Sequence, residues 1–261
     1  MSTIGKALTL LDTVSRLDQE AGLSDIARHC SLDKATARRF LVELEKHGFV
    51  EQDPGTKKYH IGPAPVRLAR IREARYPFLR TAMPFIKELA ENTMETVHIS
   101  EFAIGRLATI HVEDSPRAHR VNVDVGIILP FHATASGLAF LASCPPQQVE
   151  ALLAGPLDAY TEMTPTDPAT IKAKLDEIRQ QGYSVSNQGL EAGVVSTAAA
   201  IVAPDGHAIG TIAVAAPQAR VDAETISKFG RAAAATADKI SGTFFGLERR
   251  SAPDPLNGRR G

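Results

Sequence analysis

Apolar residues near the start of the chain recur every three or four positions, which is the spacing of one face of a helix. This spacing predicts a helix over roughly residues 3–17, on the positions Ile4, Ala7, Leu8, Leu11 and Val14. Ala21-Gly22 breaks the pattern. Ser24 then suits the N-cap of a short second helix whose buried side carries Ile26, Ala27 and Cys30.

A turn at Ser31-Leu32 leads to a third predicted helix, from Lys34 to about Lys46, with Asp33 as a good N-cap. Its apolar stripe consists of Ala37, Phe40, Leu41 and Leu44. The opposite side is therefore expected to be exposed, with Lys34, Ala35, Arg38, Arg39 and Val42.

Two short strands are expected to follow the third helix. The expected strands are Phe49-Val50-Glu51-Gln52 and Lys58-Tyr59-His60-Ile61, around the turn Asp53-Pro54-Gly55-Thr56. Such a hairpin after two helices is typical of a wing, with Lys57 and Lys58 at its tip facing backbone phosphates.

This order of helices and wing predicts a major-groove reader, because small residues permit close approach and arginines pair with guanine or clamp phosphates. Thr36 lies where a hydroxyl and free backbone N–H groups suit a phosphate oxygen. The alternative is that these basic residues are only solvated charges. The candidate DNA-binding residues are Ser24, Lys34, Ala35, Thr36, Arg38, Arg39, Lys57 and Lys58.

The pattern beyond the wing predicts a linker helix and a second domain. Pro63-Ala64-Pro65 begins a basic helix that Tyr76-Pro77 ends, and an amphipathic helix from Leu79 opens the second domain. Strands are expected at 96–102, 107–112, 183–188, 196–202 and 209–215, with helices at 131–142, 145–153, 168–181 and 221–245.

Strands at both ends of this region with helices between them indicate an α+β domain with an antiparallel sheet. The expected division is 1–62 for the winged helix-turn-helix, 63–77 for the linker helix and 78–248 for the second domain. Residues 249–261 are expected to form a disordered tail, because prolines, glycines and arginines dominate it.

Composition and charge narrow the function classes. The formal net charge is −1, but residues 1–75 carry +3 and residues 76–261 carry −4, which favours a polyanion-binding module on a non-binding partner. Cys30 and Cys144 are far apart and have no metal-ligand spacing, so neither a disulfide framework nor a zinc knuckle is expected. Apolar segments are too short to span a bilayer and no secretory signal is seen, so a cytoplasmic protein is expected.

The segment LSDIARHCSLDKATARRFLVELEKHGFVEQDPGTKKYHIGP resembles the N-terminal domain of the IclR family of bacterial regulators, from about Ile4 through Gly62. Two positions are notable in this comparison. Ser31 stands where the family usually carries Gly, and Arg38 stands at a position that the family varies and uses for base reading.

The resemblance continues through GIILPFHATASGLAFLA and IRQQGYSVSNQGLEAGVVSTAAAIVAPDGHAIGTIAVAAP to about Leu247, and it implies a GAF-like effector-binding domain. The family's effector pocket lies against the sheet and is closed by the loop before the helix of the His-Ala-Thr motif. The resemblance implies as effector-binding residues His132, Thr134, Ala135, Ser136, Ser186, Asn187, Ser196, Ala213 and Ala215. Family members that bind small oxo-acids often place an acid at Ser186, and Lys is usual at Leu138, so a less polar, larger or aromatic ligand is expected.

Structural roles are the alternatives for these residues. Ser136 could be only a helix cap, Ser186 and Ser196 could fill strands, and Ala213 and Ala215 suit a core. Glu101, His98, His111 and Asn187 could add polarity at places that the sequence does not fix. The histidines at 98, 111 and 132 raise zinc as an alternative, but they lack i,i+4 spacing and nearby cysteines, so neither a metal nor a cofactor is expected.

The leading hypothesis is a ligand-controlled transcription regulator, a repressor or an activator, that binds a palindromic operator in double-stranded DNA as a homodimer or homotetramer. A small carboxylic or aromatic metabolite is the expected effector. The alternatives are an enzyme with an N-terminal interaction module and a ligand-free architectural DNA-binding protein. No catalytic residue is expected, because the chain has no nucleophile elbow, no Ser-His-Asp order and no phosphate-cradling glycine loop.

Overall fold

The computed structural model describes residues 2–17 and 19–246 of the chain. It divides into two compact units between Pro77 and Phe78. The expected linker helix belongs to the first of these units. The tail expected at residues 249–261 lies outside the described residues.

The first unit combines four helices with a small antiparallel sheet of strand order β1-β3-β2. In chain order its elements are α1 (Thr3–Arg16), β1 (Ala21–Gly22), α2 (Leu23–His29), α3 (Lys34–Lys46), β2 (Val50–Gln52), β3 (Lys58–Ile61) and α4 (Ala64–Arg75). One core joins the expected apolar faces of α1, α2 and α3 to the hairpin, through residues such as Leu10, Ile26, Ala37, Leu41 and Val50. Helix, helix-turn-helix and wing therefore form as expected.

The start of α2 differs from the expectation. Ala21 and Gly22 pair with Tyr59 and Lys58 as strand β1, so the chain stays extended up to Gly22, which becomes the N-cap. Ser24 lies inside the first turn and is exposed, and the prediction that it caps α2 is wrong. The turn after α2 places Ser31 at φ 51°, the left-handed region that favours glycine, so the usual family glycine has a plain conformational reason.

The second unit is built on a five-stranded antiparallel sheet of order β5-β4-β8-β7-β6. Its helices are α5 (Phe78–Thr93), α6 (Ala135–Ala142), α7 (Pro146–Leu152), α8 (Pro168–Gln181) and α9 (Ala223–Phe244), with a short 3₁₀ turn η1 (Gln218–Arg220). Its strands are β4 (Thr96–Ala103), β5 (Arg106–Glu113), β6 (Ser184–Asn187), β7 (Val194–Val202) and β8 (Ala208–Pro217). The α+β architecture with an antiparallel sheet is confirmed.

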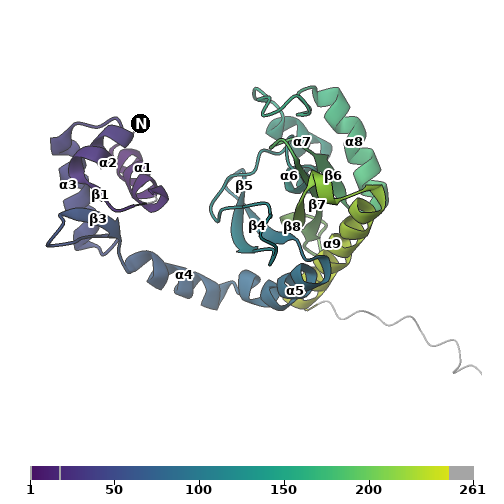
Figure 1. Cartoon of the computed structure of the whole chain (residues 1–261), viewed down its shortest axis with the longest axis horizontal. Coiled ribbons are helices and arrows are strands. Elements are labelled where there is room, and N and C mark those ends of the chain that lie inside the picture. The colour runs from purple at the N-terminus through teal and green to yellow at the C-terminus, as the bar shows by residue number, and fades with distance from the viewer. Residues whose placement is uncertain (1, 18, 247–261) are drawn as a thin grey trace, which may run out of the picture. The chain divides into compact units, whose positions relative to one another are not determined.

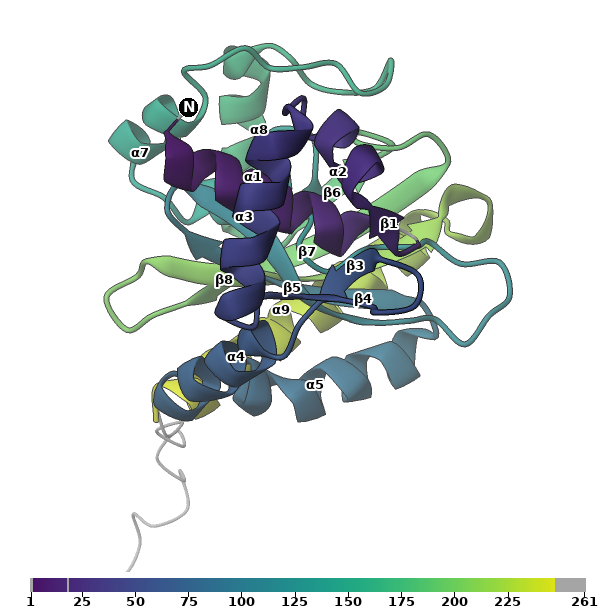
Figure 2. The same ribbon diagram turned by 90° about the vertical axis from the view of Figure 1, so that its left-hand side faces the viewer.

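Helices cover both faces of this sheet (Figure 1). α5 and α9 pack against one face, and α6 lies on the other with α8 outside it. Figure 2 shows α5 and α9 on one side of the strands and α7 and α8 on the other. The strands and helices fall close to where the pattern predicts them, except that the helix expected at 131–142 begins only at Ala135, and Gly182 closes α8 at φ 81°.

Two features of the second unit go beyond the sequence pattern. Strands β7 and β8 are longer than expected, because pairing over Val194↔Pro217 to Val202↔Ala208 extends both. The sequence pattern predicts neither a helix nor a strand for the segment between β5 and α6, yet this segment runs along the edge of the sheet. The amide of Thr109 donates to the carbonyl of Ile127 at 2.9 Å, and the amide of Leu129 donates to that of Leu107 at 2.8 Å. This segment therefore covers the free edge of β5.

Candidate functional site

The outward face of α3 carries several exposed basic side chains. Asp33 caps this helix as expected, with its carboxylate accepting from the Thr36 amide at 2.8 Å. Capping holds the pKa of the Asp33 carboxyl below its usual value, mainly through the hydrogen bond from Thr36. Near its start the helix leaves Lys34, Ala35, Arg38 and Arg39 exposed, with Thr36 half-buried beside them, and Val42 is exposed as expected.

The wing places two further lysines in solvent. The Asp53 carboxylate accepts from the amides of Gly55 and Thr56, at 3.0 and 2.6 Å, and so shapes the turn. Lys57 is exposed and has φ 59°, a conformation that a glycine would adopt at lower cost.

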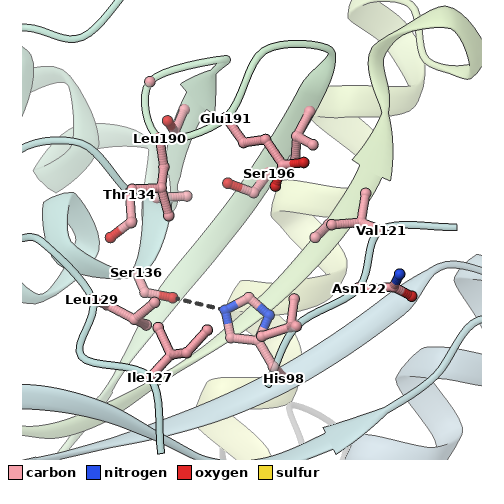
Figure 3. A pocket seen from close by; sticks show the side chains of 16 residues that line it. His98, Val121, Asn122, Ile127, Leu129, Thr134, Ser136, Leu190, Glu191 and Ser196 are labelled. Atoms are coloured by element: carbon pink, nitrogen blue, oxygen red, sulfur yellow. Dashed lines mark hydrogen bonds between the residues drawn. The ribbon is translucent and has the colours of Figure 1, made fainter. Parts of the chain in front are cut away.

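A cavity of about 130 Å³ lies in the second unit between the start of α6 and the sheet. Strands β4, β6, β7 and β8 provide its floor, and the segment before α6 and the loop between β6 and β7 provide its walls (Figure 3). A cavity of roughly 150 Å³ in another protein holds benzene, so this space suits one ring or a short chain. Its lining consists of His98, Val121, Asn122, Val123, Ile127, Leu129, Thr134, Ala135, Ser136, Ser186, Gly189, Leu190, Glu191, Val194, Ser196 and Ala215.

Six of the nine effector residues implied by the family resemblance line this cavity: Thr134, Ala135, Ser136, Ser186, Ser196 and Ala215. The sheet register explains the grouping, because Ser186 pairs with Ser196 and Ser196 with Ala215, so all three share one face.

The other three implied residues lie outside the lining. Ala213 packs in a small alanine core with Ala135, Ala139 and Ala198, and Asn187 is exposed at the end of β6. His132 is buried, with Nε2 3.0 Å from the Asp158 carbonyl. The register puts Ala213 on the face of Ala215 but one pair further along, under α6.

The start of α6 is held by Thr134. Its hydroxyl accepts from the Gly137 amide at 2.9 Å and donates to the Pro130 carbonyl at 2.9 Å. The cap is therefore Thr134, and the interpretation of Ser136 as the cap is wrong. Ser136 instead points to His98, with 3.4 Å between its Oγ and Nε2. Leu138, where the family usually carries Lys, is buried in the core with Leu107 and Phe140.

His98 is the titratable group at the floor of the cavity. Burial lowers its pKa from 6.5 to about 4, so the ring is neutral at pH 7. The lining contains no lysine or arginine, and its one carboxylate is that of Glu191. Positive potential inside the cavity comes from the N-terminus of α6, where the first amides precede the intrahelical bonds.

The wall segment is anchored to the end of the sheet. Thr96 Oγ1 donates to the carbonyl of Val121, a lining residue, at 2.7 Å. Next to it, Glu95 is buried and accepts two bonds of 2.7 Å from Arg220 and one of 3.1 Å from Arg117. Arg220 also donates to the His119 carbonyl at 3.0 Å. One buried carboxylate therefore ties η1 and the wall segment together.

The three histidines considered for zinc have separate surroundings. His98 faces Ser136, His111 lies 3.6 Å from a Glu113 carboxylate oxygen, and His132 contacts a backbone carbonyl. Among the described residues, no three His, Cys, Asp or Glu side chains gather in a way that could hold a metal ion. None of the helices in the described residues is long and apolar enough to cross a bilayer.

Several lining residues are absent from the candidate set drawn from the sequence. The wall residues from Val121 to Leu129 lie in a segment without apolar periodicity, and Leu190 and Glu191 lie in a loop. His98 is the exception, because its place on the predicted strand 96–102 was a usable signal. The alternation of β4 puts His98 on the same face as Thr96, but only the pairing with β8 shows which face that is.

Two family models match the chain. The IclR helix-turn-helix domain covers residues 3–54, and the bacterial transcriptional regulator IclR C-terminal domain covers residues 74–242. The regulator BhcR of Paracoccus denitrificans is 28% identical over 248 residues, which is 95% of this chain and 88% of that protein.

Solved structures agree with the family models. An IclR transcriptional regulator from Silicibacter sp. TM1040 is 39% identical, with a TM-score of 0.79 over 97% of this chain and 100% of that one. An IclR homologue from Microbacterium hydrocarbonoxydans, complexed with 4-hydroxybenzoate, shares the fold at 22% identity, with a TM-score of 0.81 over 95% of this chain and 100% of that one. The matched families and relatives are transcription regulators, so the enzyme alternative has no support. The chain belongs to the IclR family of DNA-binding, ligand-responsive transcription regulators.

Proposed function

We propose that this protein binds a palindromic operator through α3 and the wing, as a homodimer or homotetramer, and that a small molecule in the cavity changes its operator affinity. The observation that carries the proposal is the exposed basic face of α3, with Lys34, Arg38 and Arg39 beside the small Ala35. A helix of this kind enters the major groove, where arginine reads guanine and small residues allow close approach. Lys57 and Lys58 of the wing add contacts to phosphates.

Replacing Arg38 or Arg39 with alanine is expected to weaken operator binding about tenfold or more without unfolding the protein, because a bidentate base contact contributes about 1–3 kcal/mol. Binding is measured by fluorescence anisotropy on a duplex that the wild-type protein selects from a random library. Salt is held constant, since phosphate contacts depend strongly on it.

Arg16→Ala is the matched control. This residue is exposed on α1 and pairs with Asp12, so its removal changes the net charge of the first unit equally without touching α3. Wild-type operator affinity in both α3 variants would reject α3 as the reading helix. A similar loss of operator affinity in Arg16→Ala would show that the effect comes from the net charge of the unit and not from contacts of α3.

The cavity is the proposed effector site. Its hydroxyls and the N-terminus of α6 suit a small carboxylate, and its apolar walls suit a ring or an alkyl chain. The similar solved structure of an IclR homologue complexed with 4-hydroxybenzoate supports aromatic acids as a candidate class of effector. Effector binding would favour one arrangement of the DNA-binding units over another and so change operator affinity.

Ser186→Trp is expected to fill the cavity and abolish stabilisation by effectors. The wild-type protein is screened by thermal shift against benzoate, 4-hydroxybenzoate, propionate and lactate, and a compound at 100 times its Kd should stabilise it by about 2.7 kcal/mol. Asn187→Trp is the control, because Asn187 is the next residue of β6 but lies exposed outside the cavity. An equal response in Ser186→Trp would reject the cavity as the effector site.

Self-association is supported by exposed apolar side chains on two helices of the first unit. Ile4 and Leu8 of α1 are 74% and 58% exposed, and Val66, Leu68 and Ile71 of α4 are also exposed. One winged helix buries limited surface on DNA, so a palindromic site calls for two copies. The ligand-free architectural alternative instead requires that no metabolite changes either DNA affinity or melting temperature.

A further inference from the structure

His98 stands on β4 at the floor of the cavity, opposite the start of α6. Its side chain is 94% buried, and Figure 3 shows the ring entering the cavity with one nitrogen turned to Ser136 and the other on the side of Val121 and Asn122. Nε2 lies 3.4 Å from the Ser136 hydroxyl, whereas Nδ1 is buried with no hydrogen-bond partner. Ser136 is 1% exposed and lines the same cavity.

The unpartnered Nδ1 indicates which tautomer the ring adopts. A buried N–H donor without an acceptor is costlier than an unfilled acceptor, so the proton is expected on Nε2. Nε2–H then donates to Ser136 Oγ, and the Ser136 O–H is left to donate into the cavity. At 3.4 Å the bond between Nε2 and Ser136 Oγ is weak, so a ligand oxygen that lies beside the pair, in the cavity, gains by accepting from the Ser136 O–H and sharing the Nε2–H.

Charge in the cavity limits what that oxygen can belong to. Burial keeps the ring neutral at pH 7, no lysine or arginine lines the cavity, and the Glu191 carboxylate adds negative charge. The N-terminus of α6 compensates one carboxylate at most. A second carboxylate in the cavity would be buried without a counterion, which is strongly unfavourable.

We propose that His98 is the specificity-determining residue of the cavity, and that with Ser136 it binds an uncharged oxygen, a hydroxyl or carbonyl, of a small monocarboxylate effector. This inference rests on the proposed function, because it takes the cavity as the effector site. A site built to bond an oxygen rejects the analogue that lacks it, since the polar groups are then left unpaired.

Two pairs of probes that differ by one hydroxyl test the proposal on the full chain: benzoate with 4-hydroxybenzoate, and propionate with lactate. Calorimetry should show that the wild-type protein binds the hydroxylated member of at least one pair about tenfold more tightly. His98→Gln keeps a polar amide near the position of Nε2 and should retain the preference. His98→Leu has similar bulk, removes the Nε2–H donor and should bind both members within about threefold of each other.

Each other outcome has a defined meaning. A tenfold preference that persists in His98→Leu overturns the assignment of His98. Equal binding of both members of each pair by the wild type overturns the proposal that the cavity binds an uncharged oxygen. If none of the four probes binds the wild type, the ligand class is wrong. Ser186→Trp separates the two claims. Intact probe binding in Ser186→Trp rejects the cavity as the effector site and with it the proposed function. If Ser186→Trp loses probe binding but His98→Leu keeps the preference, only the role of His98 is rejected.

Discussion

Replacing Arg220 with methionine is expected to lower the free energy of unfolding by about 3 kcal/mol. The Glu95 side chain is 2% exposed, and Arg220 provides two of the three arginine hydrogen bonds that it accepts, both at 2.7 Å. Without Arg220 the carboxylate keeps only Arg117, which is 41% exposed and binds at 3.1 Å. A buried charge that loses its main partner keeps most of its desolvation cost, and this cost sets the size of the effect.

Urea unfolding of Arg220→Met and of the double variant Glu95→Leu/Arg220→Met measures this effect. The double variant should recover most of the loss, because apolar replacements of a buried pair are often close to neutral. Arg231→Met is the control, since this arginine is exposed on α9 and donates to Ser227 at 2.7 Å. A loss below about 1 kcal/mol in Arg220→Met would show that Arg117 or solvent compensates Glu95.

The same variant should weaken effector binding. Arg220 holds the His119 carbonyl, and two residues further on the Val121 carbonyl accepts from Thr96 at the cavity wall. Loosening this anchor increases the number of conformations of the wall that a ligand must order, so affinity falls. Operator binding without effector should change less, because the α3 face belongs to the other unit.

Gly137→Ala is expected to destabilise the second unit by about 3 kcal/mol, although alanine is the better helix former elsewhere. A Cβ at this position would lie 2.4 Å from Phe131 Cα, 2.5 Å from the Phe131 oxygen and 2.6 Å from the Pro130 oxygen. All three atoms belong to the backbone, so the start of α6 must move. Because Thr134, Ala135 and Ser136 line the cavity, effector binding should be lost with it.

Thermal unfolding and probe binding of Gly137→Ala test this expectation. Gly155→Ala is the matched control, because a Cβ there meets no atom within 4 Å and the residue does not adopt a positive φ. An unchanged melting temperature in Gly137→Ala would mean that residues 130–131 yield easily, and the cavity wall would then be softer than its packing indicates.

The DNA-binding unit could be predicted in detail from the sequence. The periodicity of α1 and α3, the Asp33 cap and the Asp53-Pro54-Gly55-Thr56 turn depend on residues close together in the chain. The error at Ser24 has a tertiary cause, since Gly22 becomes the N-cap only because β1 pairs with β3, more than thirty positions later.

The cavity could be predicted only in part. The resemblance to the family led to Ser136, Ser186, Ser196 and Ala215, but it also included Ala213, His132 and Asn187, which lie elsewhere. Strand alternation alone tells which residues share a face. Alternation does not tell how far α6 extends over that face. The extent of α6 decides that Ala213 lies in the core, whereas Ala215 lines the cavity.

By itself the sequence determined the order of elements, the two-unit plan, the third helix with its basic face, and membership of the IclR family through its motifs. These follow from local spacing, capping and turn chemistry, which act within a few residues. Only the tertiary structure decided that His98 meets Ser136, that Glu95 binds Arg220 and Arg117, and that the segment before α6 forms a cavity wall. Those contacts join residues 22 to 125 positions apart, and no local pattern records which distant side chains a folded sheet brings together.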